Sequence, residues 1–316
     1  MSNANLNRAL LAVLAALGLV LATPDASAAD LRVVGTIPDL STLAEEIGGD
    51  RVDTRSLSRG TENLHSVQVR PSMLIALNKA ELYLQMGLSM EAVWITDLLI
   101  RAKNKRIASG SSGFENCSDG WEAIQVPESL SRKGGDLHPQ GNPHFNLDPL
   151  GGPHLAAKVH SALVRVDPKG KAVYDKNYEA WKKRLAVKQE RWKKIAEGLK
   201  GKKVVVYHTE YNYFAKRVGM EVVASIEPKP GIPPSPGDVT RVVKVMEEQG
   251  AKVILTAAWS NNRQTNDIAR RTGAKVVELP NQVKGADWAT DWIALMDGIH
   301  TRLAEAYELE LEPKPE

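Results

Sequence analysis

A pattern of short apolar strands and amphipathic helices occurs twice in this chain, at a constant offset. The segment RVV at 32–34 aligns with KVV at 203–205, and ELYL at 81–84 aligns with KVIL at 252–255. The offset is 171 residues in both cases (203 − 32 and 252 − 81). Strand–helix alternation is typical of mostly parallel sheets covered by helices. Although such patterns are generic, agreement at one offset favours a true repeat. We therefore expect an α/β fold with two pseudo-repeated Rossmann-like lobes.

The expected elements follow this alternation through both halves. The β-rich runs of the first half lie at 31–37, 52–58, 81–87 and 106–110, and its helical runs at 40–48, 71–80, 91–102 and 152–166. The β-rich runs of the second half lie at 203–208, 221–227, 251–258 and 275–280, and its helical runs at 211–219, 238–250, 264–273 and 289–308.

The two halves are separated by a long charged segment with neither Pro nor Gly between Lys171 and Glu197. Its apolar residues recur at helical spacing, which predicts one rigid helix of more than twenty residues, about 30 Å long. Those apolar residues are Tyr178, Trp181, Leu185, Val187, Trp192 and Ile195. We therefore expect an N-terminal lobe over 30–169, an interlobe helix over 170–200 and a C-terminal lobe over 201–316.

The N-terminus carries an apolar run, ALLAVLAALGLVLA at 9–22, preceded by Arg8 and followed by Ala26-Ser27-Ala28. A positive flank, a short apolar core and a small-x-small site are typical of a secretory signal peptide. The alternative, a membrane anchor, needs about 20 apolar residues. No Cys lies near the cleavage pattern, which argues against a bacterial lipoprotein. We expect residues 1–29 to be a cleaved signal peptide and the mature protein to be periplasmic.

Composition excludes several classes of function. The net charge is only +3, and no basic stripe with interleaved aromatic residues occurs, so we expect no nucleic-acid partner. Cys117 is the single cysteine, which excludes a disulfide framework and a Cys-rich zinc site. No base lies near Cys117 in sequence, so we expect a bystander thiol.

Three of the seven histidines map to one edge of the expected sheets. His208 ends a strand, His65 lies in a loop that follows a strand, and His144 lies in the loop before the last helix of the first lobe. Ligands bind at the carboxyl ends of parallel strands and in clefts between domains. Three neutral imidazoles around one position suit Zn²⁺. The remaining helical histidines, His154, His160 and His300, are expected to have surface or packing roles.

Three segments carry a resemblance to a known family. They are LHSVQVRPS with His65, GNPHFNLDP with His144, and YHTEYNYFAKRVG with His208. With them, the chain resembles the periplasmic metal-binding proteins of ABC transporters, the ZnuA/TroA-like cluster A-I, over essentially the whole mature length. The resemblance implies two lobes joined by a rigid helix with the metal site in the interlobe cleft. It also implies a binding protein and not an enzyme, which captures a divalent metal and hands it to a cognate membrane ABC permease. We expect a monomer, with a metallochaperone as a further candidate partner.

The resemblance implies that His65, His144 and His208 are metal ligands. The fourth ligand departs from the family pattern, because Asn281 and Gln282 stand where relatives often carry an Asp. The substitutes are Glu227, which we favour, Asp287 or a water molecule. Asn142 also replaces an acid two residues before His144.

His138 lies six residues before His144, on the same Pro- and Gly-rich segment. Its possible roles are an outer-shell group, a transient metal-acquiring side chain or a solvent-facing residue.

Several functions remain open at this point. Zn²⁺ is the expected ion and Mn²⁺ the runner-up, because a site richer in carboxylates would favour manganese. A secreted zinc hydrolase with three His ligands would need a general base, for which Glu210 is the nearest residue. A siderophore or haem carrier would need a cleft rich in Arg or aromatic residues, whereas aromatic residues make up only 5% of the chain.

Overall fold

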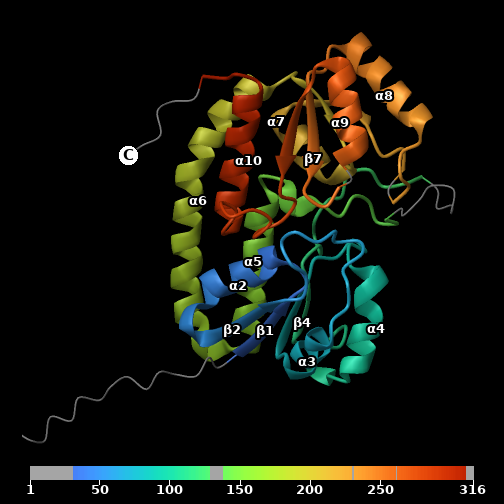
Figure 1. The fold of residues 1–316 in the computed structure, drawn as a ribbon. Coiled ribbons are helices and arrows are strands. Elements are labelled where there is room, and N and C mark those ends of the chain that lie inside the picture. Colours follow the sequence, from blue (N-terminus) through green and yellow to red (C-terminus); the bar gives the residue numbers. More distant parts are fainter. Residues whose placement is uncertain (1–30, 129–137, 230, 261, 311–316) are drawn as a thin grey trace, which may run out of the picture.

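The computed structural model describes residues 31–128, 138–229, 231–260 and 262–310. Within them, two four-stranded sheets form the centres of two lobes, and all neighbouring strands are parallel (Figure 1). The first sheet has the order β2 (Val52–Ser56), β1 (Leu31–Gly35), β3 (Leu82–Gln85) and β4 (Phe114–Asn116). The second has the equivalent order β6 (Glu221–Ser225), β5 (Lys203–Val206), β7 (Val253–Ala257) and β8 (Lys275–Leu279). The predicted α/β fold with two pseudo-repeated lobes is confirmed.

The repeat extends to the register of the central strands. Val33 of β1 pairs with Leu82 of β3, and Val204 of β5 pairs with Val253 of β7. Both partners are displaced by the same 171 residues (204 − 33 and 253 − 82). The pairing of β5 with β6 shifts register next to Val204, whereas that of β1 with β2 is regular. The two lobes are therefore equivalent at their centres and differ at one edge.

Helices cover both faces of each sheet, which explains why the central strands are apolar on both sides. In the first lobe, α2 (Pro38–Gly48) and α5 (Gly151–Val166) share one core with one face, and α3 (Pro71–Lys79) and α4 (Ala92–Ala102) cover the other. In the second, α7 (Asn212–Val218) and α10 (Trp292–Ala306) share a core with one face, and α8 (Pro236–Gln249) and α9 (Asn262–Thr272) cover the other. No helix in the described part of the chain has the length and apolarity of a membrane span.

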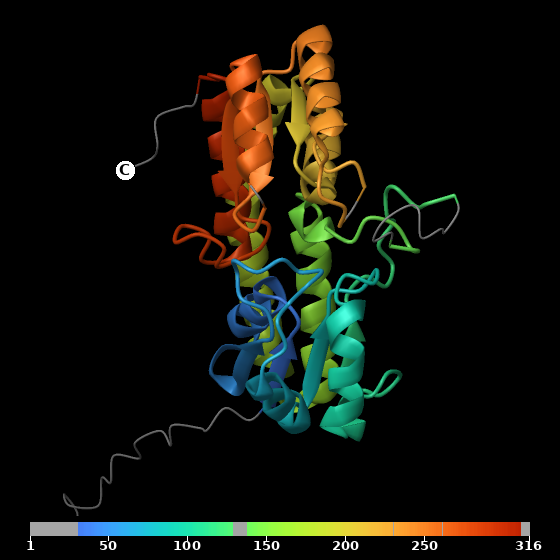
Figure 2. The ribbon, with the colours of Figure 1, turned by 45° about the vertical axis from the view of Figure 1, so that its right-hand side comes forward.

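The predicted long helix is present as α6 (Lys171–Leu199), which has 29 residues and runs beside both lobes (Figures 1 and 2). Its length is about 44 Å at 1.5 Å per residue. Trp181, Leu185 and Trp192 are buried as expected, but Val187 is 74% exposed. Val187 lies two residues after Leu185 and is therefore turned about 200° from it around the helix axis. The prediction that Val187 belongs to the apolar face of this helix was wrong.

The prediction of a strand at 106–110 was also wrong. The chain forms a short 3-10 helix there, Lys105–Ile107, and the fourth strand comes later as β4. The Asn104 side chain accepts a hydrogen bond from the backbone N–H of Arg106. Its amide donates to the carbonyls of Leu77 and Ala80. This local side-chain capping holds the turn in place of an extended strand.

A buried carboxylate fastens the two lobes to each other. Asp39 of α2 accepts hydrogen bonds from the backbone N–H of Val283, at 2.9 Å, and from the Asn146 side chain, at 3.0 Å. The same Asn146 amide donates to the Asn281 carbonyl, at 3.0 Å. Burial raises the pKa of Asp39 to about 6, while its hydrogen bonds oppose the rise. The first lobe is therefore joined to the loop after β8 through groups that water does not reach.

A second set of contacts lies beside this carboxylate. The Ser58 hydroxyl bonds the Gln282 side-chain oxygen at 3.3 Å, and the Gln282 amide donates to the Glu62 carbonyl at 3.0 Å. A Cβ on Gly60 would lie 2.0 Å from the carbonyl carbon of Lys284, so the two loops touch backbone to backbone. The loop that leads to His65 is thereby held against the second lobe.

The raised pKa of Asp39 gives a pH-dependent stability that can be measured. With an unfolded-state pKa of 3.8 and a folded value of about 6, the native state binds the extra proton. Protonation therefore adds stability as the pH falls, and that stability is lost as the pH rises through 6. Between pH 7 and pH 4.5 we expect the free energy of unfolding of the wild type to rise by about 2 kcal/mol relative to Asp39→Asn. Urea unfolding at both pH values measures this difference, since the other titrating groups are shared. A difference that stays constant or falls would contradict the assignment.

Candidate metal centre

His65 lies in the loop between β2 and α3, on the side of the first lobe that faces the second. Its backbone N–H donates to the Asn63 side-chain oxygen at 2.9 Å. The preceding residue, Leu64, is buried, and its carbonyl accepts from the indole N–H of Trp94 at 2.9 Å. The loop is therefore anchored on the core immediately before the imidazole.

His144 is buried and comes just before the 3-10 helix Phe145–Leu147. Asn142 Oδ1 lies 2.9 Å from its backbone nitrogen and 2.8 Å from its ring Nδ1. The Asn142 amide nitrogen donates to Gln125 Oε1 at 2.8 Å and to the Thr209 carbonyl at 2.9 Å. These two acceptors identify the nitrogen of the side-chain amide, so the atom that faces His144 is its oxygen. Because that oxygen can only accept, Nδ1 of His144 carries the hydrogen and Nε2 carries the lone pair. This is the tautomer that a metal ligand needs.

His208 follows β5 at its carboxyl end and is also buried. Its Nδ1 lies 2.6 Å from Oε2 of Glu227, which follows β6. The carboxylate accepts the Nδ1 hydrogen and directs Nε2 away from Glu227. A carboxylate behind a histidine is a common way to orient a metal ligand and raise its basicity.

The three imidazoles meet in the cleft between the lobes. Their ring centroids are 5.0 Å apart for His65 and His144, 5.3 Å for His65 and His208, and 5.2 Å for His144 and His208. One nitrogen from each ring lies within 4.8 Å of the others. Nε2 of His65 and Nε2 of His144 are 3.1 Å apart. Two nitrogens on a tetrahedral zinc ion lie about 3.3 Å apart, given Zn–N bonds of about 2.05 Å. The three predicted histidines are thus brought together in a geometry that suits one ion.

Burial also adjusts the charge of the site. It lowers the pKa of His65 and of His144 well below the ordinary value, and the neighbouring imidazoles lower both further. The two rings are therefore held in the neutral form, which is the form that binds a metal.

The candidates for a fourth ligand are placed differently. Glu227 uses one oxygen to bond His208, and it is outside the group of ligand atoms that lie within 4.8 Å of each other. Asp287 is exposed, and Asn281 and Gln282 hold the lobes together. His138 has its ring centroid 4.9 Å from that of His65.

Glu210, the residue considered as a hydrolytic base, is fully buried two positions after His208. Burial raises its pKa, and neither carboxyl oxygen has a hydrogen-bond partner among the described residues. Glu210 is also outside the group of close-lying ligand atoms formed by the three histidines, and its side chain is closed off from solvent. This burial disfavours a general-base role, because solvent water does not reach the carboxyl group.

A small pocket of about 230 Å³ opens onto His65 and His208 of the triad. Its lining includes His65, His138, His208, Glu227 and Trp259. Pockets for organic ligands commonly occupy about 300–1,000 Å³, so this one suits an ion better than a haem or a siderophore.

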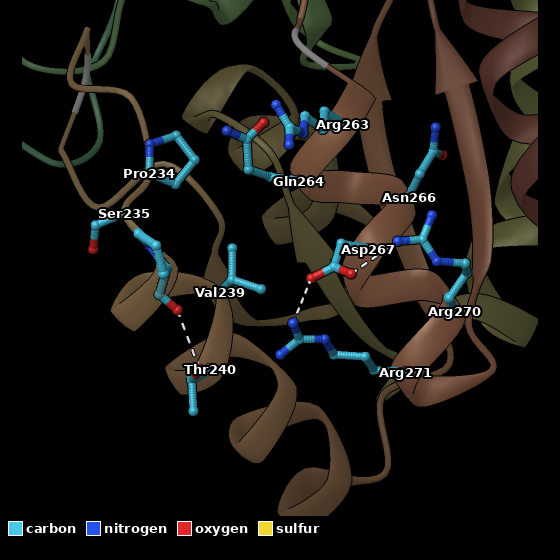
Figure 3. Close-up of a pocket in the computed structure, with 11 residues that line it drawn as sticks. Pro234, Ser235, Val239, Thr240, Arg263, Gln264, Asn266, Asp267, Arg270 and Arg271 are labelled. Atoms are coloured by element: carbon cyan, nitrogen blue, oxygen red, sulfur yellow. Dashed lines mark hydrogen bonds and ion pairs between the residues drawn. The ribbon is translucent and has the colours of Figure 1, made fainter.

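A larger hollow of about 670 Å³ lies elsewhere, between α8 and α9 of the second lobe (Figure 3). Arg270 and Arg271 in its wall both pair with Asp267, at 2.9 and 2.8 Å. None of the residues that line it is a histidine or cysteine. It is therefore not a candidate for the metal centre.

The helical histidines lie in other surroundings, as expected. His154 bonds the Cys117 carbonyl, and His160 bonds Asp175. His300 is buried in α10 and stacks on Trp192 with ring centroids 4.9 Å apart. All three pack within or beside their helices.

Two parallel-sheet lobes, one long helix and a histidine triad in the cleft place the chain among the two-lobed metal-binding proteins. A family model described as the periplasmic component A of a zinc-uptake complex, ZnuA, matches residues 33–306. The chain belongs to this family.

Individual relatives are distant and differ in the metal that their names give. The high-affinity zinc uptake system protein ZnuA of Bacillus subtilis is 23% identical over 265 residues, which cover 83% of this chain and 81% of the relative. The manganese ABC transporter substrate-binding lipoprotein PsaA of Streptococcus pneumoniae is 26% identical over 195 residues, with 60% of each chain covered. A crystal structure of ZnuA superimposes with a TM-score of 0.72 at 22% identity and covers 88% of this chain and 99% of its own. The manganese-bound periplasmic metal-binding protein of Candidatus Liberibacter asiaticus gives 0.73 at 18%, with 88% and 99% covered.

The role of Asn142 in orienting His144 was not predicted from the sequence. Asn142 stood out in the sequence only as a replacement for an acid, but it is the group that orients His144. Its spacing, two residues before a buried histidine in a turn-rich segment, is the signal that could have indicated this. In this chain an amide oxygen accepts the Nδ1 hydrogen.

The role of Asn142 gives a testable expectation for zinc affinity. Asn142→Leu removes the acceptor behind His144 and should weaken zinc binding roughly tenfold to hundredfold, as loss of an outer-shell partner does. Asn142→Asp restores an acceptor oxygen and should recover most of the affinity. Competition with a chromophoric chelator measures both, with circular dichroism to verify the fold. Zinc affinity that is equal in the folded Leu variant and the wild type would refute the role.

Proposed function

We propose that this protein is an extracytoplasmic substrate-binding protein that captures Zn²⁺ and delivers it to an ABC permease. The convergence of His65, His144 and His208 from distant parts of the chain is the observation that carries the proposal. Membership of the ZnuA family supports it, because that family is described as the periplasmic component of a zinc-uptake complex.

The mechanism is ligand exchange and requires no bond chemistry on a substrate. The neutral imidazoles replace water molecules on the arriving ion. His65 and His144 belong to the first lobe and His208 to the second, so the bound ion bridges the lobes. Release then requires a small separation of the lobes or of the loop that carries His65. This role agrees with relatives named as transport proteins and not as enzymes.

Zinc is favoured over manganese by the chemistry of the donors. The closely spaced ligand atoms among the described residues are three imidazole nitrogens. Zinc accepts nitrogen ligands in a tetrahedral site, whereas manganese suits carboxylate and other oxygen ligands. Manganese is the runner-up, since relatives such as PsaA are named for it.

Some expectations stay predictions. The signal peptide at 1–29 lies outside the described residues, and its apolar core and the family's periplasmic description support export. Four further predictions rest on the sequence: the boundaries 30–169, 170–200 and 201–316, the monomeric state, the metallochaperone and direct ligation by Glu227.

Calorimetry on the chelator-stripped protein tests the proposed function. We expect one tight Zn²⁺ site and weaker Mn²⁺ binding, with zinc binding lost in His65→Ala, His144→Ala and His208→Ala. His160→Ala is the matched control, because His160 lies on α5 and bonds Asp175 at 2.8 Å. Absence of zinc binding, or unchanged binding in the three variants, would overturn the proposal.

Two further outcomes of this experiment separate the alternatives. Tighter binding of Mn²⁺ than of Zn²⁺ would overturn the choice of ion and leave the site in place. Hydrolysis of model esters or phosphates by the zinc-loaded protein would favour the hydrolase over the transport role.

A further inference from the structure

We propose that His138 supplies the fourth ligand of the metal site and closes its tetrahedron on the solvent side. This inference rests on the proposed zinc-binding function and extends it. His138 is half-buried and lines the same pocket as His65 and His208. Its ring centroid lies 4.9 Å from that of His65, with the two planes inclined at 37°. This spacing is slightly shorter than those within the histidine triad, which run from 5.0 to 5.3 Å.

The backbone near His138 is fixed to the same structure that holds His144. The His138 carbonyl accepts from the Gly141 N–H at 3.1 Å, which closes a turn. Gly141 has φ of +105°, and a Cβ there would lie 2.8 Å from the Ile124 carbonyl oxygen. The next N–H, that of Asn142, donates to that same Ile124 oxygen at 2.8 Å. His138 is thereby held three residues before a glycine-requiring turn and four before the residue that orients His144.

The other candidates for the fourth position are already engaged or turned away. Among the described residues that line the pocket, Glu227 and His138 are the strong zinc ligands outside the triad. Glu227 holds the Nδ1 hydrogen of His208 at 2.6 Å, and moving it to the ion would break that contact. In the expected place of an acid, the Gln282 side chain bonds across the lobes, and Asn281 accepts a hydrogen bond from the first lobe through its backbone carbonyl.

Ligation by His138 requires one movement. Its ring nitrogens lie outside the group of atoms within 4.8 Å of each other, so the imidazole must rotate toward His65. The backbone turn can stay in place, since rotation about the side-chain torsions moves the ring. Four imidazoles would saturate zinc and leave no position for water, which separates this site from a hydrolytic one.

Cobalt substitution tests the inference, because tetrahedral Co²⁺ reports its own coordination in visible absorption. In the wild type we expect a spectrum that azide does not change, since no position is open. In His138→Ala a water takes the fourth position, so azide should bind and produce a new band. Zinc affinity should also fall by at least about tenfold. Loss of an outer-shell partner already lowers metal affinity by about this factor, and loss of a direct ligand should lower it at least as much. His154→Ala is the matched control, because this half-buried histidine of α5 bonds the Cys117 carbonyl away from the pocket.

The outcomes are distinguishable. A wild-type cobalt spectrum that responds to azide, or zinc affinity equal in His138→Ala and the wild type, would overturn the role of His138 and leave zinc binding intact. Azide sensitivity that appears in Glu227→Gln and not in His138→Ala would assign the fourth position to Glu227 and overturn the inference. Absence of zinc binding by the wild type would overturn the proposed function itself, and the inference with it.

Discussion

The buried hydrogen bonds of Asp39 are the constraint on which the metal centre depends. One carboxylate oxygen accepts from the Val283 backbone of the second lobe, and the other accepts from Asn146, two residues after His144. Together with the Asn142–Thr209 and Ser58–Gln282 hydrogen bonds, this contact fixes His208 relative to His65 and His144. An ionised carboxylate without water is costly, and the rise of its pKa to about 6 reflects that cost. The buried carboxylate lies where the first lobe contacts the loop after β8 of the second lobe.

The second requirement is orientation of the rings. His144 and His208 each have an oxygen acceptor behind Nδ1, from Asn142 and Glu227 respectively. Both acceptors leave Nε2 to face the cleft, where the rings of the triad lie nearly perpendicular to one another, at 69° to 79°. An amide and a carboxylate perform the same task here. The groups behind His144 and His208 therefore orient the nitrogen atoms that would bind the metal.

Much of this architecture could be predicted from the sequence, because it depends on local patterns. Strand–helix alternation and the 171-residue offset indicated both sheets, and the carboxyl ends of the strands indicated the place of His65, His144 and His208. The errors were also local: Val187 lies off the buried face of α6, and the Asn104 side chain replaces a strand at 106–110 with a turn. The pairing of Asp39 with Val283 joins residues 244 positions apart and has no local pattern that could reveal it. The fourth ligand also stayed open in the sequence, whereas Asn142 lies only two residues before His144, and that local spacing could have indicated its role.

Anomalous diffraction from zinc-loaded crystals tests the central claim most directly. Data collected on either side of the zinc absorption edge locate the ion without reference to the protein. We predict a single peak in the cleft, about 2.0–2.1 Å from Nε2 of His65, His144 and His208. A peak elsewhere, or one bound through Nδ1 of these residues, would contradict a centre formed by the three histidines and the groups behind them.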